Sequence, residues 1–245
     1  MAQPIVVENA EHFARMPLEY QELVKKQLTA HAEGELNGAD NYIMVAAPMA
    51  PDAFELRTCY ANAADEVDHY HRTAKVLSEI GLDCSYMLRQ RLEARTAYPT
   101  ELLNRSHIDR ATWIARGLTS LLAEGAALEI IEEMCESSYR PFAAICPRIH
   151  EEEKVHVGHG YRISAQFCSD RASLPEVQNA LALIWPMVLD LFGRSTSTRS
   201  QLYVKWGLLK YENEEARQRF IQLTRPKLEG LGLEVPDAHA NRRFV

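Results

Sequence analysis

The chain has 245 residues, of which 47% are hydrophobic and 25% charged, and its formal net charge is −7. This acidic balance argues against a nucleic-acid partner, because phosphate binding requires a basic face. The sequence has no apolar run long enough to span a membrane, and its five cysteines lack a C-x-x-C pair. Its first residues do not resemble an export signal, so we expect none. We therefore expect a cytoplasmic protein with reduced thiols.

The apolar residues recur at helical spacing along most of the chain, whereas period-two alternation never lasts. This periodicity predicts four long helices and two shorter ones, at 18–46, 52–80, 108–138, 141–168, 175–192 and 213–230. Asp52 is a suitable N-cap for the second helix, and Gly81 suits its C-terminal end. Pro141 can occupy the first turn of the fourth helix, and residues 106–109 resemble a capping box before the third.

Residues 82–105 form the one long irregular connection, in which 86–93 could be a short helix. No Gly/Ser linker divides the chain. We therefore expect a single all-α domain over residues 1–245, built as a four-helix bundle of two hairpins joined by this crossover, with additional C-terminal helices.

Each apolar stripe of the four long helices carries a glutamate near its middle: Glu35, Glu66, Glu124 and Glu153. A carboxylate on the inner face of a bundle costs several kcal/mol unless something compensates its charge. Two of these glutamates begin a Glu-x-x-His pattern that ends at His69 and His156, and positions three apart share one face of a helix. Two glutamates plus two Glu-x-x-His motifs form the ligand set of ferritin-like di-iron and di-manganese proteins.

The spacing of the glutamates supports this set. Glu35 and Glu66 are 31 residues apart, and Glu124 and Glu153 are 29 apart, so two similar hairpins would bring both pairs to the same level. A second group in the third helix competes with Glu124, but its members fall on the other face by spacing: Glu129, Glu132, Glu133 and Glu136. Glu132 is also too close in sequence to Glu153 to pair with it across a turn. We therefore prefer Glu124.

Other interpretations of the same residues remain open. His31, one turn before Glu35, could support that glutamate, but it fits a core histidine better than a ligand. The four glutamates could be paired with arginines, although the stripes supply no matching basic residue. Glycines on the inner stripes, Gly38, Gly117 and Gly160, could leave space for a substrate or could simply allow close helix packing.

Carboxylates with two imidazoles suit iron, with manganese as the alternative, and suit zinc less well. Such centres usually activate O2 reductively and transfer oxygen to a neighbouring substrate. The six residues would then carry the catalytic metals: Glu35, Glu66, His69, Glu124, Glu153 and His156.

From about residue 15 to Asp237 the chain resembles the family of phenylacetic-acid catabolic oxygenases, in particular the catalytic subunits of bacterial phenylacetyl-CoA epoxygenases. The resemblance runs through the metal motifs and continues at positions unrelated to metals: 31–35, 65–70, 138–143, 152–156, 185–186, 192–193, 217–220 and 231–237. The family's metal positions fall on the six residues already chosen, with Glu124 standing where an aspartate is expected.

The resemblance implies a di-iron monooxygenase that uses O2 and epoxidises or hydroxylates an aromatic acyl-CoA in aerobic aromatic catabolism. It also implies an electron-donating reductase and a homologous non-catalytic subunit, or else a homodimer. Asn62 replaces a lysine of the family and favours one alternative, a stand-alone oxygenase for a substrate without CoA. A non-catalytic metal-binding subunit is a further alternative, although such a subunit would be expected to lack ligands and this chain keeps all six. Two basic groups could bind CoA phosphates: Arg194, Arg199, Lys205 and Lys210, or Arg89, Arg91 and Arg95.

Overall fold

The computed structural model describes residues 5–90 and 113–244, and within these ranges the chain is helical with no β-strand. An isolated parallel bridge between Val7 and Tyr139 is the nearest approach to a sheet there. The all-α prediction is therefore confirmed. None of the described helices combines the length and the apolar character that crossing a membrane requires.

The chain divides into two compact units. The first comprises Met1–Arg110, Glu133–Ile149 and Leu202–Lys210. The second comprises Ala111–Glu132, His150–Gln201 and Tyr211–Val245. The expectation of a single domain stays a prediction.

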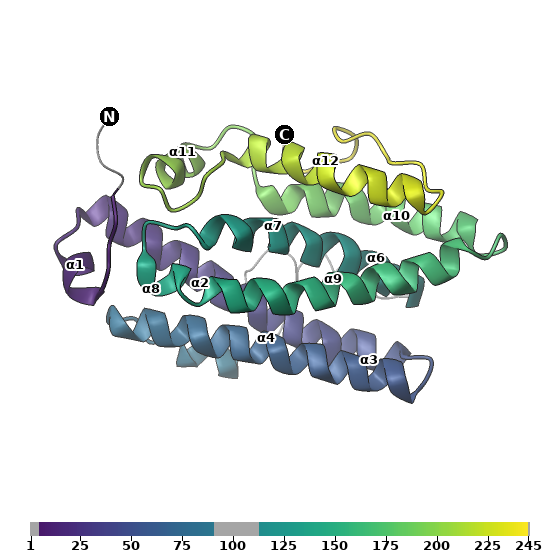
Figure 1. Cartoon of the computed structure of the whole chain (residues 1–245), viewed down its shortest axis with the longest axis horizontal. Helices are drawn as coiled ribbons and strands as arrows, with labels where there is room; N and C mark the ends of the chain where they lie inside the picture. The colour runs from purple at the N-terminus through teal and green to yellow at the C-terminus, as the bar shows by residue number, and fades with distance from the viewer. Residues whose placement is uncertain (1–4, 91–112, 245) are drawn as a thin grey trace. The chain divides into compact units, whose positions relative to one another are not determined.

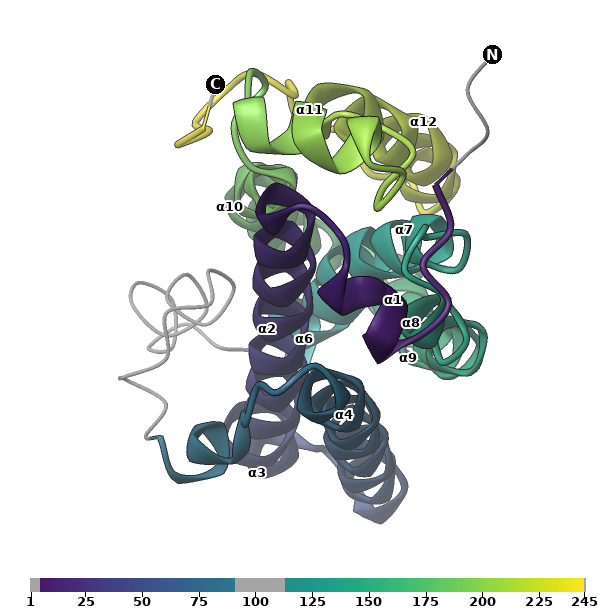
Figure 2. The same cartoon turned by 90° about the vertical axis from the view of Figure 1, so that its left-hand side faces the viewer.

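The first unit is built on a long hairpin. Its arms are α2 (Leu18–Asn41) and α4 (Ala53–Glu79), which pack against each other and lie closest toward the end that carries α3 (Figures 1 and 2). A π-helical turn, η1 (Tyr42–Ala46), and the short α3 (Ala47–Met49) connect them. This unit also holds α1 (Ala10–Ala14), the 3-10 helix η2 (Ser85–Arg89) and α8 (Arg140–Ala143).

The capping predictions for this hairpin are confirmed. The Asp52 side chain accepts a hydrogen bond from the backbone N–H of Glu55 at 2.9 Å, so it caps the first turn of α4. Gly81 follows the helix with a φ of +80°, a conformation that glycine adopts without strain. Of the predicted short helix at 86–93, η2 covers 86–89, and Gln90 is already extended. Residues 91–93 and the capping box at 106–109 lie outside the described residues.

The second unit contains these whole elements: α6 (Trp113–Thr119), the π-helical turn η5 (Ser120–Glu124), α10 (Leu174–Leu189), the 3-10 turn η6 (Asp190–Phe192) and α12 (Asn213–Gly230). It also holds most of α7 (Gly125–Met134) and of α9 (Cys146–Cys168), and the start of α11 (Thr198–Lys205). Its core is apolar and includes Trp185 stacked on Phe220, with ring centroids 6.1 Å apart. The bounds of α12 agree with the prediction.

Two predicted helices end or break earlier than expected. The third ends at Met134 instead of 138, because the backbone of Ser138 turns away to bond with Gly207 and Val7. The fourth divides into α8 and α9. Pro147 explains the break, since it has no N–H to offer the carbonyl of Ala143 and its ring would clash there.

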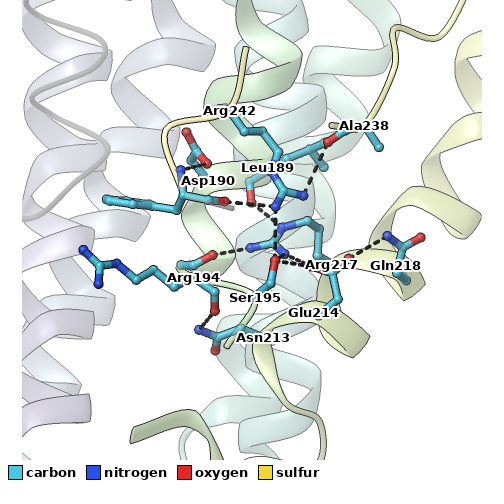
Figure 3. A network of polar contacts seen from close by, with 12 residues as sticks. Leu189, Asp190, Arg194, Ser195, Asn213, Glu214, Arg217, Gln218, Ala238 and Arg242 are labelled. Atoms are coloured by element: carbon cyan, nitrogen blue, oxygen red, sulfur yellow. Dashed lines mark hydrogen bonds and ion pairs between the residues drawn. The ribbon is translucent and has the colours of Figure 1, made fainter. Parts of the chain in front are cut away.

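A buried arginine holds the C-terminal part of the second unit together (Figure 3). Arg217 is fully buried, and its Nε donates to the carbonyl of Leu189 at 2.9 Å. Its other nitrogens donate to the carbonyl of Gly193, to Ser195 and to Glu214. Burial of the guanidinium is possible because every branch of it has an acceptor.

Candidate metal centre

The hairpin of the first unit brings three of the predicted site residues together. Glu35 projects from α2, and Glu66 and His69 project from one face of α4. Each offers a ligand atom that lies within 4.8 Å of the others, and their exposed fractions are 8%, 5% and 0%. Two carboxylates and an imidazole that converge in a buried place form a donor set that fits iron or manganese.

Glu35 is held on both carboxylate oxygens by imidazoles. His69 Nδ1 lies 3.0 Å from Oε2, and His31 Nδ1 lies 3.0 Å from Oε1. Burial alone would raise the pKa of Glu35, but the positive charge and the hydrogen bonds of His31 and His69 keep it far below its usual value. Glu35 is therefore a carboxylate that stays ionised in this buried place.

Gly38 determines where Glu66 can lie. A Cβ at position 38 would stand 2.7 Å from the Glu66 carboxyl carbon, so the carboxylate occupies the space that a side chain would fill. The other two glycines of the inner stripes are covered as tightly. A Cβ added at Gly117 would lie 2.6 Å from the side chain of Ile163, and a Cβ added at Gly160 would lie 2.3 Å from the backbone nitrogen of Leu121. Of the two interpretations of these glycines, close packing is therefore the one that the contacts support, and substrate space is not.

The second Glu-x-x-His motif lies in the second unit, on α9. Glu153 and His156 are both buried, and His156 Nδ1 lies 3.7 Å from Glu153 Oε2. At this distance the two groups face each other without a direct hydrogen bond. The helical spacing therefore places a carboxylate and an imidazole side by side, as the motif predicts.

Glu124 has a partner that the sequence analysis missed. It ends η5, and its Oε1 lies 2.5 Å from Arg116 Nη2, with Ser120 bonded to both. The expectation that the stripes lack a basic residue is therefore wrong. In a straight α-helix, residues eight apart in sequence point in directions roughly 80° apart around the axis. The π turn contains one residue more than an α-helical turn, and this brings Arg116 and Glu124 to the same side of the helix.

The competing glutamates of this helix are mostly away from the core. Glu132 and Glu136 are exposed, and Glu136 pairs with Lys210 at 2.6 Å. Glu133 is the exception: it is buried, and it accepts the backbone N–H of Lys210 at 2.9 Å. Its assignment to the outer face was wrong, and its hydrogen bond explains how it is accommodated.

A sequence model of the family described as "Phenylacetic acid catabolic protein" matches residues 1–243. The chain is also similar to one of the subunits of 1,2-phenylacetyl-CoA epoxidase from Escherichia coli (strain K12), with 27% identity over 228 residues, 91% of this chain and 71% of the relative.

Among solved structures, the chain is similar to a variant of an R2-like ligand-binding oxidase with an aerobically reconstituted Mn/Fe cofactor. The TM-score is 0.66 at 14% identity, over 93% of this chain and 87% of that one. A second structure of this oxidase, after a long soak, has a TM-score of 0.63 at 14% identity, over 93% and 85%. At this identity the likeness establishes the fold, which is the predicted ferritin-like class.

Proposed function

Because the chain belongs to the family of phenylacetic acid catabolic proteins, we propose that it is an O2-dependent di-iron monooxygenase. Its substrate is phenylacetyl-CoA or a similar aromatic acyl-CoA, whose ring it epoxidises or hydroxylates. The observation that carries this proposal is the buried group of Glu35, Glu66 and His69. The name of the similar epoxidase supports the choice of substrate.

The proposed metal ligands are three residues of each unit: Glu35, Glu66 and His69, with Glu124, Glu153 and His156. When bound, two iron ions supply the reductive activation of O2, and manganese is the alternative metal. His69 Nδ1 donates a hydrogen bond to Glu35 Oε2 in the metal-free chain, and these two atoms would have to exchange that proton for a cation when metal is bound. Their burial keeps bulk water away from the reaction.

The reaction requires partners that deliver substrate and electrons. One oxygen atom enters the ring and the other leaves as water, which consumes two electrons and two protons, so we include a reductase in the proposal. A homologous non-catalytic subunit is the proposed partner, since the relative is named as one subunit of its enzyme; a homodimer is the alternative. The cytoplasm remains the predicted location.

Of the candidate cations for CoA phosphates, Arg194, Arg199 and Arg89 are exposed. Lys205 and Lys210 already bind Glu19 at 3.2 Å and Glu136 at 2.6 Å, which makes them weaker candidates. Arg91 and Arg95 lie outside the described residues.

The test is turnover of phenylacetyl-CoA by iron-loaded protein with a supplied reductant under ¹⁸O2. Mass spectrometry should detect one labelled oxygen atom in the thioester product, which Glu66→Ala should abolish. Glu132→Ala is the matched control, because this glutamate is exposed, and it should retain activity. No labelled product from iron-loaded wild-type protein would overturn the proposal, and labelled product from free phenylacetate alone would favour a substrate without CoA.

The ion pair between Arg116 and Glu124 favours a second candidate, a non-catalytic metal-binding subunit. An arginine that already neutralises this glutamate reduces its need for a metal. In that case the chain would bind metal through Glu35, Glu66 and His69 and would show no turnover.

A further inference from the structure

His31 lies on α2 one turn before Glu35, on the same face of the helix. Its Nδ1 is 3.0 Å from Oε1 of Glu35, whereas His69 Nδ1 is 3.0 Å from Oε2. The two histidines differ in one respect. His69 belongs to the convergent group with Glu66, and His31 does not.

The environment of His31 fixes its ring. The side chain is 9% exposed, and the ring meets Phe142 edge-on, with centroids 5.2 Å apart at 75°. Nε2 has no hydrogen-bond partner among the described residues, so the bond from Nδ1 to Glu35 is the ring's polar anchor there. A carboxylate accepts only, so Nδ1 carries the proton and donates it to Oε1.

This bond restricts the carboxylate of Glu35. A carboxylate bound at one oxygen by a fixed donor loses its rotation about the last side-chain bond, and its other oxygen then points in one direction. In Glu35 that other oxygen is Oε2, the atom beside His69. Outer hydrogen bonds of this kind orient metal-binding carboxylates and imidazoles in proteins generally.

We propose that His31 is a positioning residue: it holds Oε1 of Glu35 and thereby directs Oε2 toward the metal group. This inference rests on the proposed function only in assuming that Glu35, Glu66 and His69 bind a metal. The residue acts through Glu35 and is not itself a ligand.

The experiment is a titration of metal-free protein with Co²⁺, followed by visible absorption, which reports both affinity and ligand geometry. His31→Leu removes the donor at similar size, whereas His31→Asn keeps an N–H near the position of Nδ1. Relative to wild type, His31→Leu should bind Co²⁺ about 10- to 100-fold more weakly and with a shifted absorption band. His31→Asn should restore most of the affinity and the original band.

Gln27→Leu is the matched control, because Gln27 is buried one turn earlier on the same helix. It should bind Co²⁺ as wild type does. If His31→Leu does not fold, His31→Gln replaces it, since glutamine places its N–H nearer to Nε2; the proposal then requires tighter binding by His31→Asn than by His31→Gln.

Three results would overturn the proposal. Wild-type binding by His31→Leu, while Glu35→Ala abolishes binding, would refute the role of His31 and leave the metal site standing. Equal loss in His31→Leu and His31→Asn would mean that ring packing matters and the hydrogen bond does not. Wild-type binding by Glu35→Ala would refute the metal site and the inference together.

Discussion

A glutamate that is removed from water needs a replacement for its lost hydration, and the buried and half-buried glutamates of this chain obtain it in different ways. Glu35 has an imidazole at each oxygen, Glu124 has a guanidinium, and Glu133 has a backbone N–H. The first arrangement keeps the carboxylate charged through hydrogen bonds from two imidazoles. The second already neutralises the charge, so a metal at Glu124 would have to compete with Arg116.

The close approach of Gly38 to Glu66 leads to a prediction about metal affinity. Gly38→Ala should displace the Glu66 carboxylate, because the new Cβ would lie 2.7 Å from it, and should weaken Co²⁺ binding by about 10-fold or more. Gly34→Ala is the control on the same helix, since no described atom lies within 4 Å of its Cβ position. Equal Co²⁺ affinities of the two variants in a titration would contradict this account.

The Arg116–Glu124 pair leads to a second prediction. Arg116→Gln should lower the free energy of unfolding of the metal-free protein by about 2 kcal/mol, because it removes a charged hydrogen bond from a half-buried carboxylate. If Glu124 is a ligand, added metal should recover part of this loss. Urea unfolding of the variant and the wild type, with and without Fe²⁺, measures the loss of stability and its recovery by metal.

Arg148→Gln is the control for this prediction. Arg148 is exposed and pairs with Asp68 at 3.6 Å, so its loss should change the unfolding free energy by less than about 0.5 kcal/mol. A deficit in Arg116→Gln that metal leaves unchanged would argue against Glu124 as a ligand.

The helices show which features of the fold can be predicted from local chemistry. Asp52 and Gly81 act within one turn of their own positions, and both predictions are confirmed. The break before Pro147 is also local in cause, but the apolar pattern continues through it and hides it. The early end of α7 could not be foreseen, because the groups that bond the backbone of Ser138 are distant in sequence: the N–H of Val7 and the carbonyl of Gly207.

The candidate site shows the same division. Helical spacing alone was enough to select Glu35, Glu66 and His69, which the structure brings together. It could not reveal Arg116 as a partner of Glu124, because a π turn changes the angular position of each residue beyond it and leaves no sequence signal that we recognised. It also could not show that Gly38 is covered by Glu66 instead of open space.

At the level of helix contacts, α9 provides a matched pair of glycines. Gly160→Ala should destabilise the protein by about 2 kcal/mol or more, because its Cβ would lie 2.3 Å from the backbone nitrogen of Leu121. Gly158→Ala, with no described atom within 4 Å, should instead be neutral or stabilising by up to about 1 kcal/mol. Thermal unfolding of both variants tests this difference in stability. Equal melting temperatures would contradict the close contact at Gly160.

The network around Arg217 gives a prediction about pH (Figure 3). Burial opposes ionisation of Glu214, but bonds from Gln218 and Ser195 and the charge of Arg217 lower its pKa below the ordinary value of 4.5. A lowered pKa stabilises the folded chain above the unfolded pKa, and this stabilisation is lost as the pH falls. The stability difference between wild type and Glu214→Gln should therefore be constant near neutrality and shrink below about pH 4.5. Urea unfolding across this range checks it, and a difference that grows on acidification would be inconsistent.

Over the whole molecule, the proposed ligands divide evenly between the two units. The first unit carries Glu35, Glu66 and His69, and the second carries Glu124, Glu153 and His156. If the six residues serve one centre of two ions, loss of a ligand from either unit should reduce the metal content. If only the first unit binds metal, His156→Ala should have no effect.

The most direct test of the central claim is the iron content of the purified protein, measured by elemental analysis after growth with added iron. We predict about two irons per chain in the wild type, with clear losses in both Glu66→Ala and His156→Ala and an unchanged value in Glu132→Ala. Wild-type protein without iron, or with a single zinc ion, would contradict the proposed di-iron centre.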